Sequence, residues 1–210
     1  MSPPSPFDVA TLVPSNRDLL QAVRTGRKGL ALVPCIAAEE AAREALRMAE
    51  SGVTAIAMRE ASATMADAAR AIRLPILSLQ LVATHEDALA ARAFGADAVL
   101  LDPTRSDEER EATASTARST RMVALHLART RAEVELAVSR GSKAIVVQAA
   151  DAKGLVQLAS AAGRLLVIAW PTGPLADDLP TLRGAVDAVV VDVDVWGATG
   201  FERLVSEVNP

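Results

Sequence analysis

Eight short apolar runs recur along the chain about 20 residues apart, and they constrain its fold more than any other feature. Each run is nearly continuous in apolar and β-branched residues, without the alternation of a strand that has one solvated face. Such runs are typical of parallel strands buried on both faces. They occupy residues 30–36, 54–60, 75–81, 97–102, 121–127, 143–148, 165–170 and 187–193.

The segments between these runs are rich in Ala, Arg, Glu and Leu, with apolar residues three and four positions apart, as in amphipathic helices. Three of them open with a capping box, a reciprocal side-chain cap of a helix N-terminus. The boxes are Ser106 with Glu109, Thr84 with Asp87, and Thr130 with Glu133. Four segments end at a glycine suited to a helix C-terminus, namely Gly52, Gly95, Gly141 and Gly163.

Strands that alternate with helices predict an α/β fold with a parallel sheet. Eight such units, preceded by one more helix near residues 15–25, predict a (β/α)8 TIM barrel with an extra N-terminal helix and short βα loops. We expect residues 1–210 to form a single barrel domain, with residues 1–14 as a flexible N-terminal tail. A doubly wound open sheet is the alternative, but no GxGxxG turn follows any strand.

Composition excludes several classes of function. A net charge of −4, with three Phe, two Trp and no Tyr, argues against nucleic-acid binding, which needs a basic face and stacking rings. No apolar run approaches the roughly 20 residues of a membrane span. The single Cys35 cannot form an intramolecular disulfide, and the N-terminus lacks the pattern of a signal peptide. We therefore expect a cytoplasmic protein that does not bind membranes.

The stretch PILSLQLVATHEDALAARAFGADAVLLD, residues 75–102, resembles the third and fourth strands of indole-3-glycerol phosphate synthase, a TIM barrel of tryptophan biosynthesis. RMVALHLARTRAEVELAVSRGSKAIVVQAAD resembles the fifth and sixth strands of that family, and AVDAVVVD its last strand. RDLLQAVRTGRKGLALVPC resembles its first strand and the helix before it. The order and spacing match from about residue 17 to residue 195, and the resemblance implies a carbon–carbon lyase by ancestry.

The family uses a general acid, a general base and a phosphate cradle at the C-terminal ends of its strands. By the resemblance, a lysine and an aspartate of the family fall on Leu79 and Gln80, and a glutamate falls on Leu127. Its first-strand glutamate and lysine fall near Pro34 and Ile36, its N-N-R-D segment becomes Gln148 to Asp151, and a further glutamate falls near Pro171. The loops after the first two strands are short. We therefore predict no catalytic residue, cofactor or metal, with Glu60, Asp102 and Gln148 as the candidates if catalysis survives.

The predicted binding surface is the C-terminal end of the barrel. Trp170 and Trp196 follow neighbouring strands, so they can form an aromatic contact for a protein partner or a flat apolar ligand. Asp192 and Asp194 could hold a cation with Asp102, but a single D-x-D is a weak metal motif, and the two carboxylates would repel a phosphate. The full predicted set is Trp170, Trp196, Gln80, Arg59, Asp192, Asp194, Gly173 and Gly200.

Two further residues suggest alternatives. His126 precedes Leu127 in the fifth strand, so it should point away from the barrel interior, as a hydrogen-bonded histidine between barrel and helix. Cys35 ends the first strand and could be a nucleophile, although free cysteines are more often small core residues.

Three hypotheses arise from the sequence. The chain is a degenerate synthase-like barrel that acts as a binding, scaffold or oligomeric partner protein. Alternatively, it is a lyase or other small-molecule enzyme with altered chemistry at Arg59, Glu60, Gln80, Asp102 and Gln148. The third hypothesis is an active synthase. The sequence argues against it, because no lysine lies at the end of a predicted strand.

Overall fold

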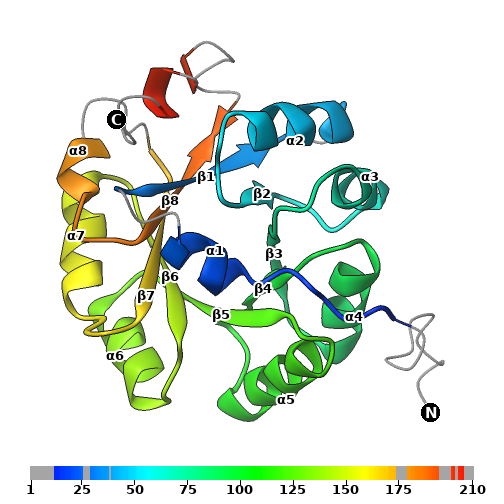
Figure 1. Cartoon of the computed structure of the whole chain (residues 1–210). Coiled ribbons are helices and arrows are strands. Elements are labelled where there is room, and N and C mark those ends of the chain that lie inside the picture. The colour runs from blue at the N-terminus through cyan, green and yellow to red at the C-terminus, as the bar shows by residue number, and fades with distance from the viewer. Residues whose placement is uncertain are drawn as a thin grey trace, which may run out of the picture.

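A computed structural model of the protein describes residues 12–25, 29–37, 39–173, 179–193, 200, 201 and 203–205. Eight parallel strands close into a barrel in chain order, with β8 paired to β1 (Figure 1). The strands are β1 (Ala31–Ile36), β2 (Ile56–Met58), β3 (Ile76–Val82), β4 (Ala98–Leu101), β5 (Val123–Ala128), β6 (Ala144–Ala149), β7 (Leu166–Pro171) and β8 (Ala188–Asp192). This architecture confirms the predicted (β/α)8 barrel.

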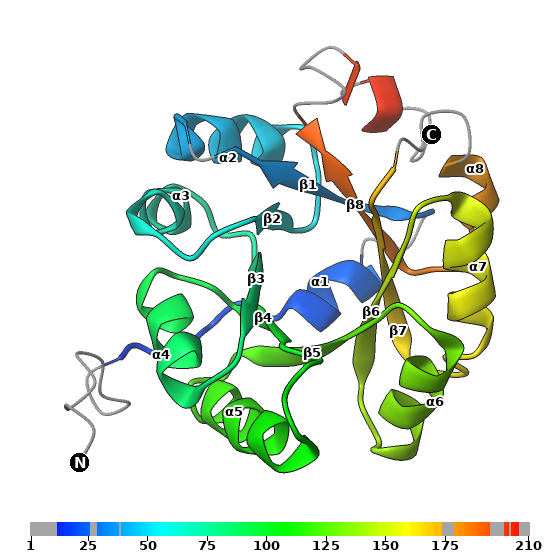
Figure 2. The same cartoon turned by 180° about the vertical axis from the view of Figure 1, so that it is seen from behind.

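Helices surround the barrel, as the view from behind also shows (Figure 2). They are α1 (Leu19–Thr25), α2 (Ala41–Glu50), α3 (Ala63–Ala71), α4 (His85–Ala93), α5 (Asp107–Ser119), α6 (Arg131–Ser139), α7 (Ala152–Ser160) and α8 (Leu179–Leu182). The three predicted capping boxes are present at the starts of α4, α5 and α6. Within the described residues, no helix is long and apolar enough to cross a bilayer.

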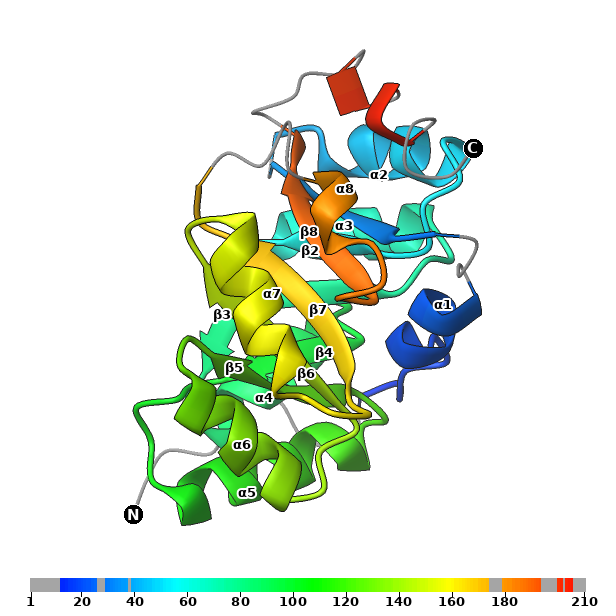
Figure 3. The ribbon, with the colours of Figure 1, turned by 90° about the vertical axis from the view of Figure 1, so that its left-hand side faces the viewer.

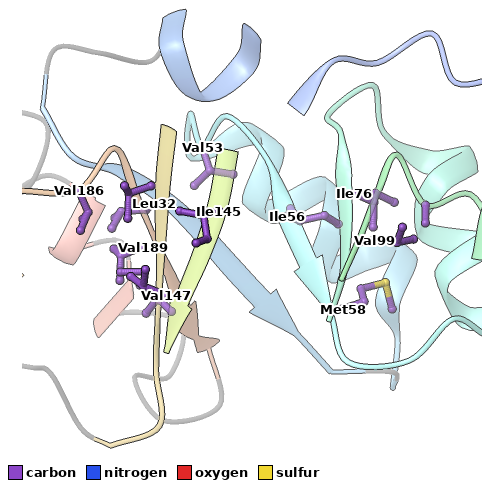
Figure 4. Packing of buried hydrophobic residues seen from close by; sticks show 14 of the residues in the cluster. Leu32, Val53, Ile56, Met58, Ile76, Val99, Ile145, Val147, Val186 and Val189 are labelled. Carbon is purple, nitrogen blue, oxygen red and sulfur yellow. The ribbon is translucent and has the colours of Figure 1, made fainter. Parts of the chain in front are cut away.

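Two apolar layers make up the core. The inner layer fills the barrel with side chains such as Leu77, Leu100 and Ile168. The predicted extra helix α1 closes the N-terminal end of the barrel, because its Leu19 and Val23 pack into this inner layer (Figure 3). The outer layer lies between barrel and helices and includes Ile76 and Val99, which lie beside each other in Figure 4. The barrel is therefore a packed core and not a pore.

A buried carboxylate ties the N-terminal segment to the barrel. Asp97, just before β4, is fully buried and accepts hydrogen bonds from the Ser15 hydroxyl (2.6 Å) and the Ile76 backbone N–H (2.9 Å). It also forms ion pairs with Arg17 (2.8 Å) and Arg92 (2.9 Å), both largely buried. Of the predicted tail 1–14, only residues 12–14 are described, and Val13 is held there through its carbonyl by Arg92.

The outer face of β5 is less covered than that of its neighbours. The outward residues of β4 and β6, such as Leu101 and Val147, are buried, whereas Ala124 and His126 of β5 are only half-buried. His126 points away from the inner layer, as the sequence predicts. Its ring makes no hydrogen bond with the described residues, so the expectation of a hydrogen-bonded histidine stays a prediction. Burial, together with the nearby Arg110 and Arg140, lowers the pKa of His126 below its ordinary value.

Replacement of Asp97 by alanine should leave two largely buried guanidinium groups without their carboxylate. We expect the free energy of unfolding to fall by about 3–5 kcal/mol, which is typical when one partner of a buried ion pair is removed. Denaturation by urea measures the change. Asp67→Ala is the control, because Asp67 pairs with Arg70 at the surface and its loss should cost less than about 1 kcal/mol. Equal losses in the two variants would contradict the structural role of Asp97.

The lowered pKa of His126 has a consequence for stability. Because the folded state binds a proton at His126 less readily than the unfolded chain does, protonation favours unfolding. The free energy of unfolding should therefore decrease as the pH falls below about 6.5, the ordinary pKa of histidine. His126→Gln should flatten this dependence between about pH 7 and 5, and His85→Gln, at an exposed histidine, should not. Identical pH profiles for the two variants would refute this assignment.

Candidate functional site

The candidate site is the barrel mouth, which we define by the inward-facing residues at the C-terminal ends of the strands: Cys35, Leu79, Leu127, Gln148 and Trp170. Barrel enzymes place their active sites at this end. Cys35, Leu79 and Leu127 are 3%, 4% and 4% exposed, and all three belong to the inner apolar layer. Trp170 is half-buried and packs against the same layer, with Gln148 as its register partner in β6. The centre of the mouth is therefore mainly apolar.

A bulge in β3 shapes one side of the mouth. The pairing of β3 with β4 shifts between Ser78 and Leu81, so that Leu79 and Gln80 have no register partner in β4. Leu79 turns inward, while the exposed Gln80 accepts a hydrogen bond from the Ala61 backbone N–H (2.9 Å) in the loop after β2. Bulges of this kind re-aim side chains and are frequent beside active sites. Here the alternation of β3 continues through the shift: Leu77, Leu79 and Leu81 pack in or against the inner layer, and Gln80 contacts a loop.

An ion pair joins the two strands on either side of β1. Arg59, directly after β2, pairs with Asp192 at the end of β8. Asp192 is the register partner of Cys35, so the pair lies at the level of the mouth. A carboxylate beside a guanidinium carries less net negative charge towards a ligand than an isolated aspartate does. Asp192 is therefore less repulsive to an anion than the sequence predicts.

Two more polar groups of the mouth are held by local contacts. The Nε–H of Arg129, directly after β5, donates to Gln148 Oε1 at 2.7 Å. Asp102, after β4, accepts from the backbone N–H and the hydroxyl of Thr104 at 2.9 and 2.8 Å. The backbone hydrogen bond from Thr104 is the main cause of a lowered pKa at Asp102, so this carboxyl is ionised near neutral pH. It is poorly suited to act as a general acid.

The other predicted residues are spread around the rim. Glu60 is exposed beyond β2, and Gly200 lies in a helical turn with the buried Phe201. Gly173 is required for close packing, because a Cβ there would lie 2.5 Å from the carbonyl oxygen of Ala150. Trp196 and Asp194 lie outside the described residues. Within the part of the chain that the structure describes, no group of three or more His, Cys, Asp or Glu side chains could hold a metal ion.

Arg129 is a residue of the mouth that the sequence did not single out. Its signal was its position, because it lies between the end of β5 and Thr130, the N-cap residue of α6. Asp151, the one carboxylate that the resemblance retains, has a structural contact in the helix that follows β6. Its side chain caps α7 by accepting from the Gly154 backbone N–H at 2.7 Å.

Comparisons with known proteins support the fold. No protein-family model matches the chain, and no curated protein sequence matches it. Among solved structures, the chain is similar to tryptophan synthase from M. tuberculosis in an open form with BRD0059 bound, with a TM-score of 0.67 and 12% sequence identity. The match covers 93% of this chain and 97% of the other. At this identity the likeness shows that the protein shares the (β/α)8 barrel fold of that structure.

Proposed function

We propose that this protein is a divergent relative of the indole-3-glycerol phosphate synthase family that lacks synthase activity and acts as a binding, scaffold or oligomeric partner protein. The observation that carries the proposal is the burial of Leu79 and Leu127 in the inner layer at the mouth. The resemblance assigns a lysine and a glutamate of the family to these two positions. This proposal includes a cytoplasmic location, which rests on the composition of the chain.

The chemistry of the family explains why these two positions matter. Ring closure, decarboxylation and dehydration need groups that donate and accept protons beside the substrate. A leucine side chain can do neither, and both leucines fill space that a reacting group would need. Two polar groups of the mouth are engaged in local contacts: Gln148 accepts from Arg129, and Asp102 accepts from Thr104. These contacts favour a rim that recognises a partner over one that transfers protons.

The alternative is a lyase or other small-molecule enzyme that uses different mouth residues. Two observations favour it: Asp102 is held in its ionised form, and Arg59 with Asp192 places opposite charges at one edge of the mouth. A carboxylate such as Glu60 or Asp102 could then serve as a general base, although the lowered pKa of Asp102 makes it the weaker base.

The purified full chain should not convert carboxyphenylaminodeoxyribulose phosphate to indole-3-glycerol phosphate. Each missing proton-transfer group typically contributes on the order of 10²- to 10⁴-fold to the rate. Indole fluorescence of the product measures turnover, with an active synthase in the same assay as the positive control. Turnover that Glu60→Gln or Asp102→Asn abolishes would refute the proposal and support the enzymatic alternative.

The partner surface that we propose is the mouth face that carries Trp170. Tryptophan is enriched among residues that dominate the energy of protein interfaces. The half-buried ring of Trp170 packs on the inner layer and leaves part of its surface for a contact. Trp196 follows β8, the strand next to β7, and we include it in the same surface on the basis of its sequence position.

Replacement of Trp170 and Trp196 by alanine should weaken self-association or partner association by roughly 2 kcal/mol or more if these rings anchor the interface. Sedimentation of the full chain measures the association state, and a thermal melt measures the effect on folding. Leu136→Ala/Val138→Ala is the matched control, because these two residues are 40% and 41% exposed on α6, away from the mouth.

Three outcomes of this experiment distinguish the mouth from α6 as the contact surface. Loss of association only in the tryptophan variant supports the mouth as the contact. Loss only in the α6 variant would move the contact to α6. An unchanged association state with a much lower melting temperature in the tryptophan variant would identify the indoles as core packing and refute the contact surface.

A further inference from the structure

A cavity of about 1060 Å³ lies on the outside of the barrel, against β5. Its lining comes from α5, from β5, from the end of α6 with the following loop, and from the segment around α1. Figure 2 shows α5 and α6 on the two sides of β5, with α1 across the end of the barrel. Its volume is close to the upper end of the range for small-molecule sites, about 300–1,000 Å³. The cavity is separate from the mouth, so a ligand bound in it is independent of the proposed function.

The cavity is strongly cationic in an acidic protein. Whereas the whole chain carries a net charge of −4, six cationic side chains line this one space against three acidic ones. The acidic residues are Asp18, Asp107 and Glu111. The cationic residues are Arg17, Arg110, Arg118, Arg121, Arg140 and Lys143.

The ion pairs around the cavity do not neutralise all of these cations, although Arg17 pairs with the buried Asp97 and Arg118 pairs with Glu111. Asp107 at the start of α5 pairs with both Arg110 and Arg140, so one carboxylate serves two guanidinium groups. These two arginines also lower the pKa of Asp107. Arg121 and Lys143, near the N-terminal ends of β5 and β6, form no ion pair with the described residues. Positive charge therefore exceeds negative charge among the residues that line the cavity.

One wall of the cavity is apolar. Leu101, Met122 and Ala124, which belong to or pack against the outer layer, line it along β4 and β5. His126, the next outward residue of β5, lies beyond Ala124 towards the mouth end. A half-buried imidazole without a hydrogen bond to the described residues can donate or accept one for a ligand. Cations, an apolar wall and one imidazole together match a ligand with an apolar body and a negatively charged group.

We propose that this cavity binds an organic anion, a carboxylate or phosphate monoester with an apolar group. The apolar group lies on Met122 and Ala124, and the anionic group lies among the arginines and Lys143. His126 contacts the ligand from the mouth end. Cationic side chains recognise carboxylates and phosphates through charge-assisted hydrogen bonds, which are about twice as strong as neutral ones.

The two histidines of the chain make a direct test available. The probe is 1-anilinonaphthalene-8-sulfonate, which combines an aromatic body with one anionic group. In proton NMR of the full chain, the probe should shift the imidazole signals of His126 and raise its pKa by about half a unit or more, because an anion beside the ring favours its charged form. His85 is exposed on α4, far along the chain from this cavity, and serves as the internal control.

Substitutions at the cavity rim test the role of charge. Arg121→Asn/Lys143→Gln removes two positive charges, and asparagine tolerates the left-handed φ of 60° at position 121. The variant should weaken probe binding, measured by its fluorescence, by about 3- to 10-fold. Lys153→Gln/Arg164→Gln removes the same charge from exposed positions outside the cavity and should leave the affinity unchanged. N-phenyl-1-naphthylamine, the probe without its sulfonate, should bind both variants equally.

Each outcome supports or overturns the site. Saturable binding that moves His126 and depends on Arg121 and Lys143 supports it. A probe that binds without moving His126, that binds both double variants with the same affinity, or that shows no saturable binding would overturn it. Equal loss of the charged and the uncharged probe in the Arg121→Asn/Lys143→Gln variant would also overturn it, because a local distortion and not the charge would then explain the effect.

Discussion

The pairing of β8 with β1 is the constraint on which the rest of the structure depends. Five register pairs, from Ala31 with Ala188 to Cys35 with Asp192, close the sheet on itself and remove both of its edges. Closure gives every strand an inside and an outside, so alternate residues face either the inner layer or the helices. Leu127 and His126 are neighbours in sequence, yet closure sends one to the packed interior and the other to the cationic cavity. Both candidate sites of the protein therefore depend on the same alternation along one strand.

The two halves of the barrel use the same local device before β4 and β8, in the segments DAVLLD and DAVVVD. Asp97 accepts a hydrogen bond from the backbone N–H of Ile76, and Asp187 accepts one from that of Val167, so each aspartate holds the neighbouring earlier strand in register. Further contacts surround Asp97 in the first half. Two arginines accompany Asp97 in a buried network that recruits the segment before α1. The segment before α1 is therefore anchored next to the start of β4.

The parts of the structure that local rules determine could be predicted from the sequence. All eight strands, the capping boxes and the helix-ending glycines were found, because buried parallel strands and helix termini leave local signals. For example, Gly95 has a φ of 98°, and a Cβ there would lie 2.4 Å from that of Ala69. The bulge at Leu79, the pairing of Arg59 with Asp192 and the uncovered face of β5 were not predicted. They depend on register shifts, side-chain directions and the spacing of helices, which residues distant in sequence decide together.

The mouth and the outer cavity beside β5 differ in their polar groups, and this difference decides which kind of ligand each can bind. At the mouth, an apolar centre is bordered by groups that bond mainly to one another, such as Arg129 with Gln148, so a ligand there would displace existing contacts before gaining new ones. On the outer face, one carboxylate, Asp107, is shared between two guanidinium groups, and further cations lie around an apolar wall. An anion bound there would gain charge-assisted contacts without first breaking a complete network, because part of the positive charge has no carboxylate opposite it. A broad apolar contact therefore suits the mouth, because an interface gains free energy when it excludes water from apolar area. A small anionic ligand suits the outer cavity, because an anion is attracted by cations that have no carboxylate partner.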